Sequence, residues 1–194
     1  IEFCIATRRL DLLFGDIFQK FEACGFVTVF VNLLEPYVLN EKLTYIAPIA
    51  MAAFVEQCKL SGELNMVERC LLHMDVKVMD FDSVLKLLRV NKMFSALLHV
   101  YAHGLDDFVT PLELLYEEIF DVADLKDTKA KANFEQYVGK ALLFLTYSFH
   151  DKSFPSHSAL PDDRILTLRP QLLNLILSPK YIVNRSRQQG RPVV

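Results

Sequence analysis

The chain has 194 residues, 52% of them hydrophobic, and a mean hydropathy of +0.23. This composition excludes an intrinsically disordered protein, because disordered chains are poor in hydrophobic residues. The formal net charge of −3 provides no overall basic field for binding nucleic acid. The longest apolar run, 45–55, is shorter than the roughly 20 residues that span a bilayer, and no signal peptide is recognisable. We therefore expect a cytosolic protein, and the first residue, Ile1, predicts a segment of a longer one.

Amphipathic helices are predicted along most of the chain, because apolar residues recur at spacings of three and four. In chain order these helices cover residues 10–21, 27–39, 46–60, 63–73, 81–88, 94–103, 111–123, 129–149 and 162–177. Prolines predict an interruption or restart of the second helix at Pro36 and a kink or split of the last at Pro170. The β-branched segment 25–31 resembles a strand, but no second strand candidate pairs with it, so a helix is predicted there.

The clearest helix–turn–helix pattern lies between residues 90 and 115. The apolar face of its first helix consists of Phe94, Leu97, Leu98 and Tyr101. Gly104 follows at the position where a helix end favours a left-handed residue. Thr110 and Glu113 then form a capping box around Pro111, which predicts the start of the next helix.

Taken in pairs, the predicted helices make units of about 35 residues, a period typical of helical solenoids. We therefore predict an all-α fold, an α-solenoid of stacked antiparallel helical hairpins. Residues 1–178 are predicted to form a single solenoid segment of a larger protein. Residues 179–194 are predicted to be a basic tail or linker, because they hold four basic residues, no acid and little apolar periodicity.

Neither the cysteines nor the histidines form a recognisable metal motif. The four cysteines are far apart, lie in apolar segments and form no Cys-x-x-Cys pair: Cys4, Cys24, Cys58 and Cys70. They are predicted to be reduced core residues. His99 and His103 have the spacing at which two imidazoles can share a metal on a helix, but a zincin would need an intervening glutamate and a third ligand. We predict no metal site and no cofactor.

Catalytic residues are not predicted either. Asp106 and Asp107 with His103 could suggest an acid–base pair, and Ser95 or Ser148 a nucleophile. No Gly-x-Ser-x-Gly elbow or glycine-rich phosphate loop accompanies them. The two aspartates fit a turn near the positive end of the following helix. The sequence therefore indicates a protein that is not an enzyme.

The strongest charge pattern is acidic. Residues 106–127 contain eight acids and one base. On the predicted helix from residue 111, four acids line the side opposite the apolar residues: Glu113, Glu117, Asp121 and Asp124. A solvated helix face is the ordinary explanation of such a stripe, and a docking surface for a basic partner is the alternative.

Three segments carry a resemblance to a known family: residues 71–82, 91–101 and 104–112. They resemble the central helical region of the vacuolar protein sorting-associated protein eight family, the large subunits particular to the CORVET endosomal tether. The resemblance implies an α-solenoid between an N-terminal β-propeller and a C-terminal RING-type zinc module. It also implies a complex that bridges early endosomal membranes before fusion and is recruited by an endosomal Rab GTPase.

The resemblance predicts a non-catalytic scaffold segment that supports docking and fusion of vesicles with early endosomes. Its implied partners are the other tethering-complex subunits and an endosomal Rab GTPase, with peripheral membrane association through the complex and no nucleic acid. The alternative is another helical adaptor or coat-type module that docks peptides. A contiguous exposed apolar groove would favour that alternative, whereas a deep polar pocket would favour an enzyme.

Overall fold

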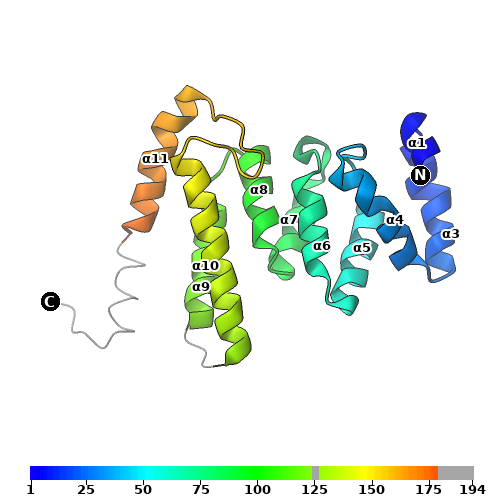
Figure 1. Cartoon of the computed structure of the whole chain (residues 1–194), viewed down its shortest axis with the longest axis horizontal. Coiled ribbons are helices and arrows are strands. Elements are labelled where there is room, and N and C mark those ends of the chain that lie inside the picture. The colour runs from blue at the N-terminus through cyan, green and yellow to red at the C-terminus, as the bar shows by residue number, and fades with distance from the viewer. Residues whose placement is uncertain (124–126, 179–194) are drawn as a thin grey trace. The chain divides into compact units, whose positions relative to one another are not determined.

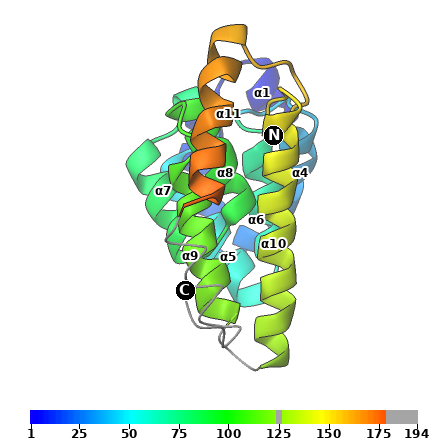
Figure 2. The same cartoon turned by 90° about the vertical axis from the view of Figure 1, so that its left-hand side faces the viewer.

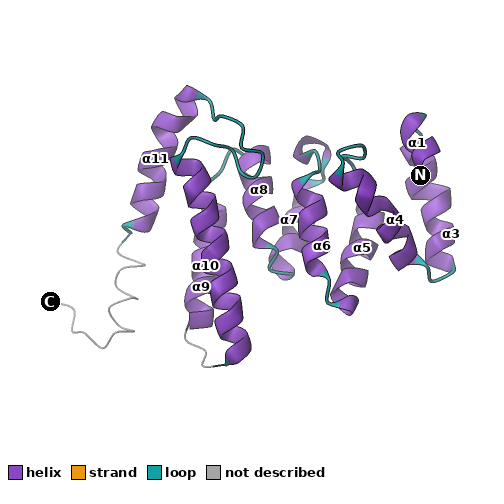
Figure 3. Cartoon of the chain, viewed as in Figure 1, coloured by secondary structure: helices purple, strands orange, loops and turns teal. Residues whose placement is uncertain are grey.

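The computed structural model describes residues 1–123 and 127–178, and every regular element in them is a helix (Figures 1 and 3). The elements are α1 (Glu2–Ala6), α2 (Leu10–Leu12), the π-helix η1 (Leu13–Ile17), α3 (Phe18–Ala23), α4 (Val27–Leu39), α5 (Pro48–Ser61), α6 (Leu64–Leu72), the 3₁₀-helix η2 (Val76–Val78), α7 (Phe81–Val90), α8 (Phe94–Gly104), α9 (Thr110–Ala123), α10 (Thr128–Phe149) and α11 (Asp162–Ile176). Among the described helices, none combines the length and the apolar character needed to cross a bilayer. The predicted all-α fold is confirmed.

The helices pack mainly on their neighbours in the chain, as in an α-solenoid. In one compact unit, residues 1–100, α3 contacts α4, α4 contacts α5, and α5 contacts α6. In the other, which begins at Tyr101, the long helix α10 lies against α9 and also contacts α11 (Figure 2). The assignment of residues 1–178 to a single solenoid segment stays a prediction. The predicted tail, 179–194, lies outside the described residues.

A cluster of aromatic rings forms the core at the N-terminal end of the first unit. The predicted helix over 10–21 is present, but its middle turn is a π-helix, Leu13–Ile17, and it continues into α3. Phe30 of α4 is 1% exposed, and its ring centroid lies 5.3 Å from that of Phe18 and 5.3 Å from that of Phe21. The segment that resembled a strand is therefore a helix that buries Phe30 against α3.

Both internal prolines lie within continuous helices. α4 runs through Pro36 and α11 runs through Pro170, so the predicted interruption of α4 and the split of α11 are wrong. A proline removes only one helical hydrogen bond, and the burial of apolar side chains on both sides of the proline maintains the helix. In α11, Leu168 and Leu172 flank Pro170 and are each 0% exposed.

The turn between α8 and α9 is made by two aspartates rather than by a glycine. Gly104, the predicted left-handed residue, is still helical, and Asp106 has the positive φ of 53° instead. The carboxylate of Asp107 accepts hydrogen bonds of 3.0 Å from the backbone N–H groups of Val109 and Thr110. Aspartate tolerates a left-handed backbone better than most residues, so Asp106 can adopt this conformation in place of Gly104. Aspartate also caps helix N-termini, which is the role of Asp107.

A buried carboxylate stabilises the start of α8. Glu68 of α6 is 8% exposed, and its Oε1 accepts a hydrogen bond of 2.8 Å from the backbone N–H of Ser95. Ser95 lies in the first turn of α8, where helical N–H groups have no partner within the helix. A negative charge is also favourable at this end of a helix. Glu68 therefore connects α6 to α8.

We predict that Glu68→Ala lowers the free energy of unfolding by about 1–3 kcal/mol, because it leaves the partly buried N–H of Ser95 without its acceptor. Glu68→Gln retains an acceptor oxygen and is expected to lose less. Glu56→Ala, which removes an exposed glutamate from α5, is the control. Urea denaturation measures all three variants, and equal stabilities of Glu68→Ala and Glu56→Ala would contradict the prediction.

Candidate interaction surfaces

The predicted acidic stripe lies on the exposed side of α9. Glu113, Glu117 and Asp121 are exposed, while Leu112 and Leu115 on the other side of the helix are 0% exposed. The fourth predicted residue, Asp124, lies outside the described residues. Exposure of three acids at a spacing of four fits the solvated face that the sequence indicates. Its use as a docking surface stays a prediction.

His103 connects α8 to the loop that follows α10. Its Nε2 lies 2.8 Å from the carbonyl oxygen of Phe154 and 3.0 Å from Oγ of Ser153. A carbonyl oxygen only accepts hydrogen bonds, so Nε2 carries the proton and donates. A base for a serine nucleophile needs a free lone pair on the nitrogen that faces the hydroxyl. His103 therefore does not activate Ser153 in this arrangement and holds the loop instead.

The two aspartates considered as part of an acid–base pair have structural partners instead. The Asp106 carboxylate forms an ion pair with Nε of Arg164 at 2.9 Å, and the Asp106 carbonyl oxygen accepts a hydrogen bond from the same guanidinium. The guanidinium carbon of Arg164 also lies 4.9 Å from the centre of the Phe108 ring. Asp107 caps α9, as described above. Asp106, Phe108 and Arg164 line a polar cavity of about 380 Å³, where they form a structural corner rather than an acid–base pair.

The two serines considered as nucleophiles, Ser95 and Ser148, lie in helices. Ser148 is 2% exposed, and its hydroxyl donates a hydrogen bond of 2.9 Å to the carbonyl oxygen of Phe144, one turn earlier in α10. Ser95 is the residue whose N–H binds Glu68. Neither position is the sharp strand-to-helix turn that exposes a nucleophile. In the part of the chain that the structure describes, no three His, Cys, Asp or Glu residues group together as metal ligands.

Three of the four cysteines are buried, and Cys24 is exposed, so its prediction as a core residue is wrong. Cys24 is the last residue before Gly25, which has a φ of 74° and ends the α3 turn. Burial, followed by the charges of Glu63 and Glu35, raises the pKa of Cys58 to about 11. Burial and then the charge of Glu35 raise the pKa of Cys70 to about 12.

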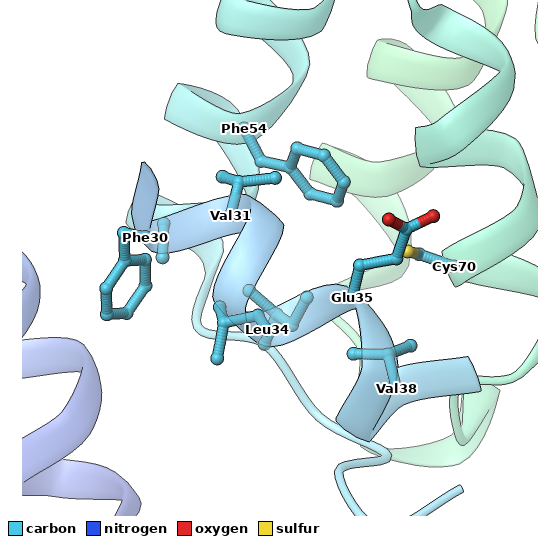
Figure 4. Close-up of a pocket in the computed structure, with 9 residues that line it drawn as sticks. Phe30, Val31, Leu34, Glu35, Val38, Phe54 and Cys70 are labelled. Atoms are coloured by element: carbon cyan, nitrogen blue, oxygen red, sulfur yellow. The ribbon is translucent and has the colours of Figure 1, made fainter. Parts of the chain in front are cut away.

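Glu35 and Cys70 line a small enclosed cavity between α4, α5 and α6 (Figure 4). The cavity has a volume of about 10 Å³, at the lower limit for one water molecule. Apart from Glu35 its walls are almost entirely apolar, with Phe30 and Phe54 among them. The Glu35 carboxylate pairs with Arg69. This cavity is therefore a packing defect next to an ion pair and not a ligand site.

We predict that N-ethylmaleimide at pH 8 labels Cys24 of the folded protein rapidly, and Cys58 and Cys70 only on unfolding. The thiolate is the reactive form, and a pKa of about 11 leaves about one Cys58 thiol in a thousand ionised at this pH. Mass spectrometry of peptides after timed labelling measures each site. Labelling of Cys70 in the folded protein as fast as Cys24 would contradict the burial described here.

The largest mainly apolar depression that we describe in the first unit, named here the α5–α7 groove, was not predicted. Its volume is about 330 Å³. It is lined by Tyr45, Ile46, Pro48, Met51, Ala52, Met74, Met79, Asp80, Ser83, Val84 and Leu87. These residues come from α5, α7 and the two connections that precede them, so no local periodicity relates them. The only sequence feature that could have indicated the groove is its methionine content, since three of the five methionines line it.

Comparison with known proteins places these helices in a family. The family model described as the Vps8 central TPR matches residues 29–193. Two relatives are the vacuolar protein sorting-associated protein 8 homologs of Mus musculus, 26% identical over 196 residues, and of Homo sapiens, 25% identical over 179 residues. The alignments cover 100% and 91% of this chain but only 14% and 12% of the relatives. No solved structure matches. Because the family model covers most of the sequence, this chain belongs to the Vps8 central TPR family.

Proposed function

We propose that this chain is a non-catalytic scaffold segment of a CORVET-like endosomal tethering complex, where it supports docking and fusion of vesicles with early endosomes. The observation that carries the proposal is the family match over residues 29–193, which includes α4 to α11 in the described chain except the first two residues of α4. Helices that pack in chain order support it, because such arrays hold distant surfaces at fixed positions and offer long faces to partners.

A scaffold role agrees with the hydrogen bonds and the ion pair of the polar groups considered as catalytic. His103 donates to a backbone carbonyl, Asp106 pairs with Arg164, and Asp107 caps a helix. Each polar group therefore stabilises a loop or a helix end. The proposed partners are other subunits of the tethering complex and an endosomal Rab GTPase, with membrane association through the complex alone.

The first test is co-purification of the chain with the other tethering subunits and with the GTP-loaded endosomal Rab. We expect a complex with at least one of them. A second arm replaces residues 1–178 in the whole protein with an unrelated helical solenoid and measures vesicle tethering. A folded, monomeric chain that binds none of these proteins, and whose replacement leaves tethering unchanged, would overturn the proposal.

The acidic stripe is the proposed docking surface for a basic partner. The double substitution Glu117→Lys and Asp121→Lys reverses two exposed charges on α9. We expect several-fold weaker binding at low salt, because complementary charges steer association, and a smaller effect at high salt. Glu22→Lys with Glu56→Lys is the matched control on exposed positions of α3 and α5. Unchanged affinity for every partner would remove the stripe from the proposal.

A peptide-binding adaptor is the second candidate function, and the α5–α7 groove is the observation that favours it. An apolar depression of about 330 Å³ is within the size range of ligand pockets. The two roles are compatible, since a scaffold can also hold a partner segment.

A further inference from the structure

The α5–α7 groove has features of a binding surface rather than of an imperfect core. The helix α7 carries apolar residues on one side, yet Leu88 is the one α7 side chain that is fully buried. Val84 and Leu87 are half-buried and line the groove instead. Their exposed surface would gain stability from contact with another apolar group.

The floor of the groove is adaptable. Met51 and Met74 are each 5% exposed, and Met79 is half-buried beside them. Unbranched thioether side chains rearrange at low cost, and surfaces that accept varied apolar groups use methionine for this reason. The floor can therefore adjust to a large side chain that enters from outside.

The lining of the groove carries one charged side chain, and its charge is negative. Asp80 is the one charged residue among the eleven that line the groove, and it is exposed. The hydroxyl of Ser83 donates a hydrogen bond of 2.6 Å to its Oδ2, which fixes the carboxylate at the first turn of α7. Asp82 is also exposed in this turn. A lysine or arginine next to an apolar side chain would complement this edge.

We propose that the α5–α7 groove binds a short segment of a partner protein that presents one bulky apolar side chain beside a lysine or arginine. The apolar side chain enters between α5 and α7, and the basic group pairs with Asp80. This proposal deepens the scaffold function proposed above, because it locates one partner contact and states its chemistry.

The test uses the whole chain with ¹³C-labelled methionine methyl groups and three synthetic peptides: GSKFKSG, GSEFESG and GSKAKSG. We expect GSKFKSG to shift the methyl signals of Met51, Met74 and Met79 but not those of Met66 and Met93, which do not line the groove. GSEFESG should bind about tenfold more weakly because like charges meet at Asp80. GSKAKSG should bind no more than marginally, since it lacks the apolar anchor.

Two variants and one control variant make the test specific. Ala52→Phe places a large ring in the groove from an exposed position and should abolish the shifts caused by GSKFKSG. Asp80→Asn should reduce the preference for GSKFKSG over GSEFESG to less than twofold. Asp82→Asn, outside the lining, should leave most of that preference intact. If Ala52→Phe fails to fold, Asp80→Asn still decides the proposal.

Several results would overturn the proposal: no shift at millimolar peptide, equal shifts of all five methionines, equal binding of GSKFKSG and GSEFESG, or an unchanged preference in Asp80→Asn. Binding of the uncharged detergent octyl glucoside to these three methionines, without binding of GSKFKSG, would also overturn it in favour of a lipid-like occupant. Co-purification with tethering subunits separates the two proposals. Peptide binding without co-purification and with unchanged tethering would reject the scaffold role alone, and co-purification without peptide binding would reject the groove alone.

Discussion

Replacement of Phe144 by alanine is expected to lower the free energy of unfolding by about 3–5 kcal/mol, the usual cost of emptying a buried phenylalanine site. Phe144 lies in α10 and is 0% exposed. Its ring centroid is 5.9 Å from that of Phe108, before α9, and 5.7 Å from that of Phe154, in the loop after α10. One side chain therefore holds two connecting segments against the longest helix, and its loss leaves a cavity that both would have to fill.

The matched control for Phe144→Ala is Leu142→Ala, which removes an apolar side chain two residues away in the same helix. Leu142 is 59% exposed, so its truncation should change stability by no more than about 0.5 kcal/mol. Urea denaturation followed by circular dichroism measures both variants, and limited proteolysis of residues 150–161 reports whether the loop has loosened. Similar stabilities of the two variants would show that Phe144 is not the centre of this core.

Phe30→Ala is expected to have an effect of similar size, about 3–5 kcal/mol, in the other compact unit. Its ring contacts those of Phe14, Phe18 and Phe21, with centroid distances of 6.5, 5.3 and 5.3 Å. Aromatic pairs at such separations add to the stability that burial alone provides. Phe30→Ala therefore removes both the burial and three ring contacts, and the segments most affected should be α3 and α4.

Hydrogen exchange with mass spectrometry tests the location of this effect. In Phe30→Ala the amides of α3 and α4 should exchange faster than in the unmodified chain, because local opening of these helices becomes easier. Leu33→Ala, at a position 48% exposed in α4, is the control and should leave their exchange nearly unchanged. Faster exchange confined to α9 and α10 would contradict the assignment of Phe30 to the N-terminal core.

Most helices could be predicted from the sequence because their signals are local. The helix Val27–Leu39 has the predicted bounds, and Thr110–Ala123 differs by one residue. Gly62, with a φ of 77°, ends α5 at the predicted break. Apolar periodicity and a glycine that accepts a left-handed backbone both act within a few residues, so their effects can be read without knowing the neighbours.

The features that were missed depend on contacts between distant segments. The left-handed backbone conformation expected at Gly104 occurs at Asp106 instead. Arg164, 58 residues later in the chain, binds both the carboxylate and the carbonyl oxygen of Asp106. α4 continues through Pro36 because its buried residues lie on both sides of the proline. A pattern that spans four residues carries no information about such partners.

The sequence by itself determined the helical fold, most helix bounds, the family resemblance and the exposed acids at Glu113, Glu117 and Asp121. These depend on spacing along one helix or on matching residues in order. The tertiary structure alone decided which face of α7 remains open and that Met51, Met74 and Met79 share a groove with Asp80. The physical reason is that packing brings together side chains from separate segments, whereas apolar periodicity reports only which side of a single helix avoids water.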